Sequence, residues 1–364
     1  MSFSDNSSFS RTIHVNTGKP YDVIIERGVL NQCGYWVKKV LPKAESCVIV
    51  SDSNVAPLYA DTVKQSLEAA GYKVSVSIFP AGEENKRLPA IVGMYEAFTQ
   101  AELSRSDFAV ALGGGVTGDM CGFAAATYLR GIPFVQIPTT VLSQNDSSVG
   151  GKTGIDLECG KNLVGSFHQP CLVLADADTL YTLPPRYVTD GFGEIIKHGC
   201  IKSADLFELI EAHGTDMNRV EELTARSVEI KAGVVERDEK ESGERMLLNF
   251  GHTVGHAIEK CAHYTGIAHG EAVGIGMLIM ARAGEAAGLT EKGTSARILA
   301  VLEKCGMPTS CPFTHEQICE AAMLDKKRRG ETMNIVLLKA IGDSFVHKIR
   351  CADLLDFVRK GMDV

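Results

Sequence analysis

Hydrophobic and polar positions in the first half of the chain repeat one pattern, in which a β-branched run is followed by a turn and then an amphipathic stretch. Apolar residues recur at 3.6-residue spacing in 56–70 and 87–100, which predicts helices there. Strands that alternate with helices are typical of a mostly parallel, doubly wound sheet. We expect strands at Thr12–Val15, Asp22–Ile25, Cys47–Val50, Val74–Ile78, Phe108–Leu112, Phe134–Ile137 and Leu172–Leu174.

The pattern changes after residue 174, and strand signals almost vanish between 185 and 305. Helices are predicted at Gly193–Ile201, Ala204–Ala212, Val220–Glu239, Gly251–His263, Glu271–Ala287 and Thr294–Cys305. Two later β-rich runs, Asn334–Leu338 and Ser344–Ile349, flank a turn and predict a hairpin. The sequence therefore predicts an α/β fold, with a Rossmann-like, mostly parallel sheet domain at 1–180 and a mainly α-helical domain at 181–364. We expect the functional site in a cleft between them.

Composition supports two domains and narrows the function. The 364 residues exceed what one hydrophobic core usually supports. Thirty-seven basic against 45 acidic residues leave a charge of −8, the wrong sign for a general nucleic-acid binder. The chain shows neither a leader-like apolar start nor a stretch long enough to span a bilayer, so we expect a cytoplasmic protein with no membrane partner. Eleven scattered cysteines without a CxxC pair fit reduced thiols.

A glycine loop follows the predicted strand at 108–112. Gly113, Gly115 and Gly118 fill the strand–turn–helix fingerprint of a dinucleotide-binding loop, whose helix N-terminus favours a pyrophosphate. A tight turn in a packed sheet is the alternative. The loop does not open the domain, and no acidic residue ends a strand about twenty residues on. Asp52 and Glu83 are substitutes that could bind nucleotide hydroxyls, or they are a helix cap and a solvated carboxylate.

The segment 137–156 is dense in hydroxyls and glycines and follows a strand end. Hydroxyls, exposed amides and Lys152 suit phosphate or polyol binding, with a flexible surface loop as the alternative. The run Gly150-Gly151-Lys152-Thr153 is only superficially similar to a Walker loop, because the earlier glycine of that motif is missing.

Polar residues follow a regular spacing in the second half. Arg245, Asn249, His252 and His256 are spaced 4, 3 and 4, which places them on one side of the chain if the run is helical. The two histidines could share a metal, or they could lie on a solvated face.

Further candidate ligands lie on either side of this run. His269 opens the next predicted helix, and Glu194 lies three residues before Lys197 on a mostly apolar helix. One Glu with two His is a typical catalytic zinc set that leaves a coordination position for substrate. Spacing alone leaves open which two histidines ligate.

These segments together resemble the 3-dehydroquinate synthase family over nearly the whole chain. The matching blocks, in the family's order, are PAGEENK, GGGVTGD, IPTTVLSQNDSSVGGKTGID, GKNLVG, TLYTLPPR, GEIIKHG, ERMLLNFGHTVGHAIE, HGEAVGIGM and DKK. The resemblance implies a cytoplasmic homodimer of the shikimate pathway that uses NAD and Zn2+ or Co2+. Its reaction would convert 3-deoxy-D-arabino-heptulosonate 7-phosphate to 3-dehydroquinate and phosphate by transient oxidation, elimination, reduction and aldol cyclisation.

The resemblance also implies roles for individual residues. The metal ligands would be Glu194, His252 and His269. Catalytic groups would be Lys152, Lys197, His256, Asp146 and Glu241. Substrate would be bound by Arg130 of a second subunit and by Asn162, Lys231, Arg245, Asn249 and Lys326. NAD would contact Asp52, Glu83, Lys86, Gly114, Gly115, Val116, Thr117, Gly118, Asp119, Thr139, Thr140, Lys152, Lys161, Asn162, Thr179, Leu180, Tyr181 and Thr182. The chain departs from the family at Asn145, Gly193 and His198, where an apolar residue, Ala and an aromatic residue are usual.

Three other functions compete with this reading. A related sugar-phosphate cyclase would share the metal ligands and glycine loop, but Arg245 suits a carboxylate that plain sugar phosphates lack. A metal-dependent alcohol or glycerol dehydrogenase would release NADH and has no need for so many phosphate and carboxylate partners. A nucleic-acid binder would have to use the short basic run 326–329, which on an acidic chain is more often a solvated loop.

Overall fold

The computed structural model describes residues 9–324 and 331–363, which form two compact units. The first unit runs to Leu183 and also takes in Lys231–Glu236. The second comprises Pro184–Ile230 and the chain from Arg237 onward. Among the described residues, no helix combines the length and apolar character that crossing a bilayer requires.

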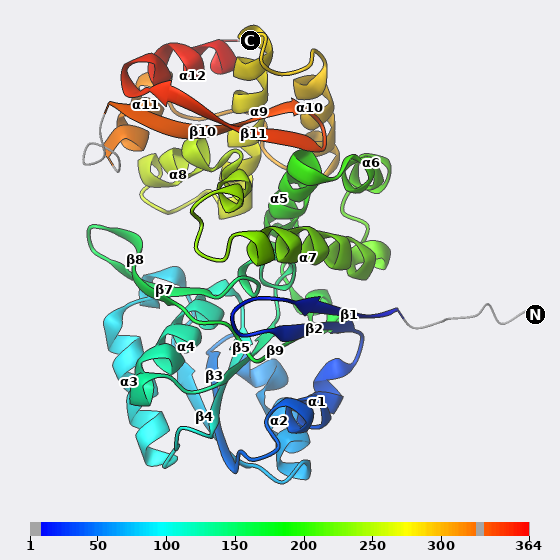
Figure 1. The fold of residues 1–364 in the computed structure, drawn as a ribbon, viewed down its shortest axis with the longest axis vertical. Coiled ribbons are helices and arrows are strands. Elements are labelled where there is room, and N and C mark those ends of the chain that lie inside the picture. The colour runs from blue at the N-terminus through cyan, green and yellow to red at the C-terminus, as the bar shows by residue number, and fades with distance from the viewer. Residues whose placement is uncertain (1–8, 325–330, 364) are drawn as a thin grey trace, which may run out of the picture. The chain divides into compact units, whose positions relative to one another are not determined.

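A seven-stranded sheet forms the centre of the first unit, in the order β1-β2-β9-β6-β5-β3-β4 (Figure 1). β1 and β2 pair antiparallel, and the remaining neighbours are parallel. The sheet confirms the predicted α/β class and all seven predicted strands. Their bounds are β1 Ser10–Val15, β2 Tyr21–Glu26, β3 Ser46–Asp52, β4 Lys73–Phe79, β5 Phe108–Gly113, β6 Phe134–Pro138 and β9 Leu172–Ala175.

Helices cover both faces of this sheet because successive strand residues point to opposite sides. Cys47 and Ile49 of β3 pack with α1 (Cys33–Val40) and α2 (Ala56–Ala69). Val48 and Val50 pack on the other face, with α3 (Leu88–Gln100) and α4 (Gly115–Thr127). Figure 1 shows the two helix pairs on opposite sides of the sheet. A sheet buried on both faces explains the continuous apolar runs of the sequence.

The chain reverses its winding direction between two neighbouring strands, β3 and β5. β3 leads through α2 to β4 at one edge of the sheet, whereas β5 leads through α4 to β6 on the other side. The loops at the carboxyl ends of β3 and β5 therefore diverge, and ligands of doubly wound sheets bind at such a point.

A two-stranded hairpin of β7 (Lys152–Leu157) and β8 (Gly160–Phe167) corrects the loop reading of the segment after Gly151. Gly154 and Gly165 face each other across the ladder, where a Cβ on Gly165 would lie 2.2 Å from the Thr153 carbonyl oxygen. Close backbone approach thus accounts for glycines that, in the sequence alone, weaken the strand signal.

The second unit is mainly helical, as predicted, with a hairpin of β10 (Thr332–Ala340) and β11 (Asp343–Arg350). α9 is buried along most of its length and packs against α5, α8, α10 and α12. α11 and α12, like α1 in the first unit, were not predicted. The helices are α5 Pro185–Lys202, α6 Ala204–His213, α7 Val220–Arg237, α8 His252–Cys261, α9 His269–Ala286, α10 Thr294–Lys304, α11 His315–Leu324 and α12 Leu354–Met362.

The polar run at 245–256 is not one helix, which corrects the expectation of a single stripe. A 3-10 helix covers Glu244–Asn249, and α8 begins at His252 after Gly251, whose φ is 79°. A Cβ at Gly251 would lie 2.7 Å from the Val273 carbonyl oxygen of α9. The break therefore combines a left-handed residue with a close contact between α8 and α9.

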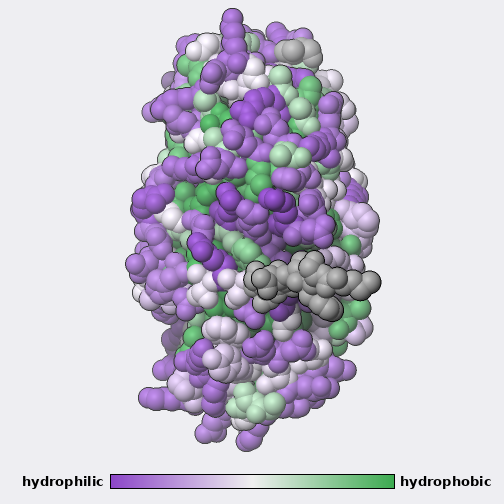
Figure 2. Space-filling model, turned by 90° about the vertical axis from the view of Figure 1, so that its right-hand side faces the viewer, coloured by the Kyte–Doolittle hydropathy of each residue, from purple (hydrophilic) through white to green (hydrophobic). Residues whose placement is uncertain are grey.

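The molecular surface carries mostly polar groups on the face drawn in Figure 2. Hydrophilic residues predominate there, and hydrophobic residues form smaller patches among them. This distribution agrees with a chain in which 23% of residues are charged.

Gly251→Ala should lower the free energy of unfolding by about 2–5 kcal/mol, since a left-handed alanine and a backbone clash both oppose the native turn. Gly288→Ala is the matched control, because Gly288 has a φ of 70° but nothing within 4 Å of an added Cβ. It should cost only about 1–2 kcal/mol. Denaturant unfolding of both variants measures the difference, and equal losses would contradict the proposed clash.

Candidate functional site

The glycine loop of the first unit lies at the point where the winding reverses. β5 ends at Gly113, and α4 begins at Gly115 with Gly114 as its N-cap, whose lack of a side chain leaves the helix amides without a side-chain cap. Asp52 ends β3, and its Oδ2 accepts a long hydrogen bond from Thr117 Oγ1, at 3.4 Å. The structure thus brings the substitute acid Asp52 next to the loop, as an acid that binds nucleotide hydroxyls would need to be.

A buried lysine lies close to the other end of this loop. Lys86 Nζ lies 2.6 Å from Asp119 Oδ2 and 2.7 Å from Asn162 Oδ1. Burial lowers the pKa of Lys86, but the charges of Asp119 and Glu83 outweigh it and raise that pKa above its ordinary value. Lys161 Nζ lies 3.4 Å from Glu83 Oε1. Three sequence segments thus place predicted NAD residues in one polar cluster.

The remaining predicted cofactor residues, apart from Lys152 on β7, lie on two further segments. Thr139 and Thr140 follow β6, and the Thr140 methyl group would lie 3.2 Å from a Cβ on Gly114. Thr179 to Thr182 lie on the 3-10 helix Ala177–Thr182. Gln144 ties the two segments together, because its Nε2 donates to the Pro138 carbonyl and to Thr179 Oγ1. Tyr181 is 59% exposed.

Predicted substrate residues of the first unit are partly brought together. Lys231 Nζ lies 2.8 Å from Asp146 Oδ1 and donates to the Asp146 carbonyl at 2.7 Å. Lys152 is exposed at the start of β7. Arg130 is exposed and has a φ of 68°. Lys326 lies outside the described residues.

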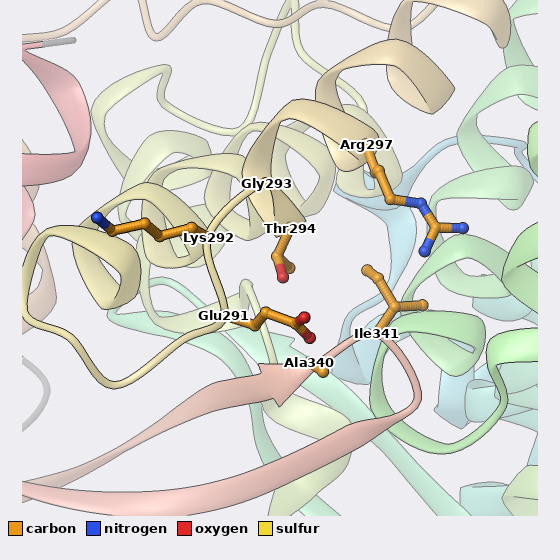
Figure 3. Close-up of a pocket in the computed structure, with 7 residues that line it drawn as sticks. All are labelled: Glu291, Lys292, Gly293, Thr294, Arg297, Ala340 and Ile341. Atoms are coloured by element: carbon orange, nitrogen blue, oxygen red, sulfur yellow. The ribbon is translucent and has the colours of Figure 1, made fainter.

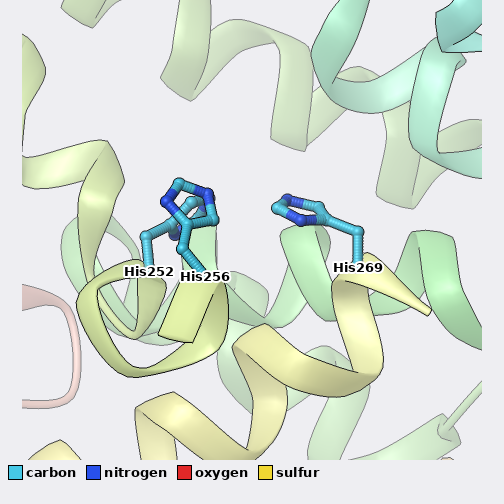
Figure 4. A group of neighbouring side chains, drawn as sticks. All are labelled: His252, His256 and His269. Carbon is cyan, nitrogen blue, oxygen red and sulfur yellow. The ribbon is translucent and has the colours of Figure 1, made fainter. Parts of the chain in front are cut away.

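In the second unit, one carboxylate oxygen faces two imidazoles. Glu194 Oε1, on α5, lies 3.4 Å from His252 Nε2 and 3.5 Å from His269 Nε2. His252 begins α8 and His269 begins α9, and Figure 4 shows their rings approaching each other together with His256. Two donors on one tetrahedral zinc ion lie about 3.3 Å apart, given bond lengths of about 2.0–2.1 Å. These three residues therefore fit a shared divalent cation.

Both imidazoles turn their other nitrogen toward an oxygen atom. His252 Nδ1 lies 3.2 Å from the Phe250 carbonyl, and His269 Nδ1 lies 3.4 Å from Glu259 Oε2. Metal-binding histidines are commonly oriented in this way, with the free Nε2 left for the ion.

The charge balance around Glu194 favours cations. Its side chain is 1% exposed, and its Oε2 forms an ion pair with the buried Lys197 ammonium. Burial lowers the pKa of His269, but hydrogen bonds with Glu194 and Glu259 outweigh it and raise that pKa to about 10. Burial also holds the pKa of His252 well below its ordinary value. The carboxylates thus attract a positive charge at this point.

His256 is a second possible partner for an ion. One nitrogen each of His252, His256 and His269 lies within 4.8 Å of the others. His256 is exposed, however, whereas Glu194 is buried between charged groups. Its position one turn beyond His252 suits a group that meets substrate.

Arg245 and Asn249 lie on the 3-10 helix that precedes α8. Arg245 is 1% exposed, and its Nη1 donates to the Glu239 carbonyl at 2.5 Å. Asn249 Nδ2 donates to Glu241 Oε1 at 2.9 Å. Two predicted substrate residues, Arg245 and Asn249, and the predicted catalytic residue Glu241 thus form one corner of the second unit.

Asp238, which the sequence analysis did not single out, holds this corner. Its Oδ2 accepts from the Gly243 and Arg245 amides at 2.7 and 3.0 Å, and its Oδ1 accepts from the Ser242 amide at 2.9 Å. The Ser242 amide, followed by these other donors, lowers the pKa of Asp238 to about 2. An aspartate followed by Ser and Gly four and five residues later is the signal that could have found it.

Gly193, His198 and Asn145, where the sequence departs from the pattern it resembles, each make a close local contact. A Cβ on Gly193 would lie 2.6 Å from the Gly270 carbonyl oxygen, so glycine lets α5 and α9 approach closely. His198 is fully buried, with its Nδ1 2.5 Å from Ser227 Oγ. Asn145 is also buried and donates to the Val141 carbonyl at 2.6 Å.

A cavity elsewhere in the second unit is unrelated to these groups. It measures about 390 Å³, and its lining contains no predicted site residue (Figure 3). Its lining residues are Glu291, Lys292, Gly293, Thr294, Arg297, Ala340 and Ile341. Because this cavity does not coincide with the clustered polar side chains, we locate the candidate site by those side chains.

Comparison with known proteins covers nearly the whole chain. The family model described as 3-dehydroquinate synthase N-terminal matches residues 76–190, and that described as 3-dehydroquinate synthase C-terminal matches residues 191–328. A 3-dehydroquinate synthase of Clostridium acetobutylicum is 42% identical over 354 residues, covering 96% of this chain and 99% of that protein.

Two solved structures share the fold at moderate identity. A 2-deoxy-scyllo-inosose synthase complexed with carbaglucose-6-phosphate, NAD+ and Co2+ has a TM-score of 0.87 and 26% identity, covering 96% of this chain and 100% of that one. A 2-epi-5-epi-valiolone synthase from Streptomyces hygroscopicus subsp. jinggangensis, with NAD+ and Zn2+ bound, has a TM-score of 0.84 and 27% identity, covering 94% and 97%.

Asp238→Ala should destabilise the protein near neutral pH by about 1–2 kcal/mol, because three amides lose a charged acceptor that is partly screened by solvent. Since folding lowers the pKa of Asp238, its contribution is full above about pH 4 and is lost as the pH falls toward 2. Urea unfolding at pH 6 and pH 2.5 should therefore show a larger difference from the unsubstituted protein at pH 6 than at pH 2.5. The same difference at both values would contradict this role.

Proposed function

Since the chain belongs to the 3-dehydroquinate synthase family, we propose that it converts 3-deoxy-D-arabino-heptulosonate 7-phosphate to 3-dehydroquinate and phosphate in the shikimate pathway. The observation that carries this proposal is the convergence of Glu194, His252 and His269 at metal-ligand spacing, in a unit that also holds the buried Arg245. In this proposal, an oxidation that is reversed within one turnover would use the glycine loop to hold NAD+ and these three residues to hold the cation.

Two cofactors are part of the proposal. Bound NAD+ would accept and return one hydride, and a divalent Zn2+ or Co2+ would polarise the alcohol oxygen. Glu194, His252 and His269 would hold the metal, and the distances from Glu194 Oε1 to the two imidazole nitrogens support this. The glycine loop, Asp52 and the cluster around Lys86 would hold NAD, which their place at the winding reversal supports.

The chain's own groups would bind and orient the anionic substrate. Arg245 has a planar fork of donors that suits a carboxylate. Lys152, Lys197 and Lys231 would neutralise negative charge locally, as an acidic protein must when it binds an anion. His256 is exposed beside the metal ligands and would hold the phosphate and move a proton there. We assign Asp146, Glu241, Asn162, Asn249 and Lys326 to substrate contacts as well.

We also propose a cytoplasmic homodimer in which Arg130 enters the site of the partner. Arg130 is exposed, and both it and Leu129 have a positive φ. A non-glycine residue in this conformation costs energy, so a function for the side chain would explain why it is kept.

A related sugar-phosphate cyclase is the second candidate, because the two solved structures are named as inosose and valiolone synthases. The greater identity to 3-dehydroquinate synthases and the buried Arg245 favour the first candidate.

A single assay separates the candidates. Protein, Co2+, NAD+ and the heptulosonate phosphate are mixed, and phosphate release is followed together with NADH absorbance. We expect one phosphate per substrate without accumulating NADH, and loss of activity on chelation. Sustained NADH formation from simple alcohols would instead identify a dehydrogenase, and turnover of glucose 6-phosphate would identify an inosose-type cyclase.

Arg245→Ala should weaken transition-state binding by about 2–5 kcal/mol, because a buried charged partner of the substrate is lost. NAD+ affinity, measured by fluorescence titration, should change little. Arg245→Lys is the matched variant, because it keeps the charge but loses the fork of donors. Its loss of transition-state binding should be smaller than that of Arg245→Ala. Equal weakening of substrate and NAD+ binding in both variants would contradict the assigned role.

A further inference from the structure

Glu259 is a buried carboxylate beside the candidate metal ligands. It lies on α8, at positions i+7 and i+3 from His252 and His256, so the three residues share one side of the helix. Glu259 is only 5% exposed, and its neighbours Ala257 and Ile258 are buried as well. A carboxylate in such surroundings is costly unless a charged or hydrogen-bonding partner compensates it.

His269 supplies that compensation and links two acids. Its Nδ1 lies 3.4 Å from Glu259 Oε2, while its Nε2 lies 3.5 Å from Glu194 Oε1. The imidazole therefore spans two carboxylates through opposite ring nitrogens. When a cation is bound, an imidazole held in this way would keep its proton on Nδ1 and present the Nε2 lone pair to the cation.

The two histidine ligands differ in this second contact. His252 Nδ1 faces a neutral acceptor, the Phe250 carbonyl, whereas His269 Nδ1 faces a carboxylate. A charged acceptor strengthens the hydrogen bond and makes the ring a better electron-pair donor than a carbonyl does.

We propose that Glu259 is a positioning residue for the metal site, which fixes the ring of His269 and strengthens its Nε2 as a ligand for a divalent cation. This inference rests on the proposed function, because it requires Glu194, His252 and His269 to be the ligands. Glu259 itself touches neither substrate nor metal in this assignment.

The test uses the full-length protein stripped of metal. The dissociation constants for Co2+ and Zn2+ are measured by competition with a chromophoric chelator, and the visible absorption of the Co2+ form reports ligand geometry. Glu259→Ala should weaken metal binding about 10- to 100-fold and shift the Co2+ bands. Glu259→Gln keeps the shape and an acceptor oxygen but loses the charge, so we expect a smaller weakening in the same direction.

Glu271→Gln is the matched control. Glu271 lies two residues after His269, where its Oε2 accepts from the Ala268 amide at 2.8 Å and from Arg186 Nη2 at 3.0 Å. It supports the same helix start without a contact to the imidazole in the described structure, so its loss should leave metal affinity within about threefold and the Co2+ spectrum unchanged.

The outcomes separate this inference from the proposed function. If Glu194→Ala abolishes Co2+ binding but both Glu259 variants match the unsubstituted protein, the inference is wrong and the metal site stands. If Glu194→Ala leaves Co2+ binding unchanged, both the ligand assignment and the inference fail. Should Glu259→Ala not fold, Glu259→Gln decides, and an affinity loss equal to that of Glu271→Gln would overturn the positioning role.

Discussion

One buried carboxylate sets the organisation of the second unit. Burial of the Glu194 carboxylate is costly unless positively charged groups compensate it. α5 provides the first of these groups in Lys197, one turn further on. The remaining donors come from two other helices, so α8 and α9 must both begin next to α5. Asp190 helps to fix that meeting point by accepting from the Gly270 amide at 2.5 Å. Gly193 and Gly270 permit the close approach.

The first unit also buries charged side chains, but it does so around a sheet. Its sheet is buried on both faces, and several residues of its candidate site lie in segments that follow the carboxyl ends of the strands. Lys86 is buried there among Asp119 and Asn162, and Lys231 is buried against Asp146. Both units thus hold positively charged side chains at particular buried positions, although the net charge of the chain is −8. Such placement allows an acidic protein to accept a strongly anionic ligand.

The sequence predicts much of what depends on local periodicity, although α1, α11 and α12 were missed, and it does not reveal contacts between distant residues. Strands β3 and β5 and helices α2 and α9 follow from apolar spacing and from glycine signals. The β7–β8 hairpin was missed because its Gly154–Gly165 contact involves two separate segments. Spacing also left the choice among His252, His256 and His269 open, because α8 and α9 meet only in the folded chain. The role proposed for Glu259 is visible only through its contact with His269.

The left-handed turn at Gly251 separates Arg245 and Asn249 from His252 and His256 by a change of helix type. Mutational drift could therefore remodel one pair while the other stays in place. A lineage that gained a new sugar as its reactant could alter the short 3-10 segment while α8, which carries the candidate metal ligand His252, stayed unchanged. This modularity offers a physical route by which a single scaffold diversifies into several carbocycle-forming enzymes.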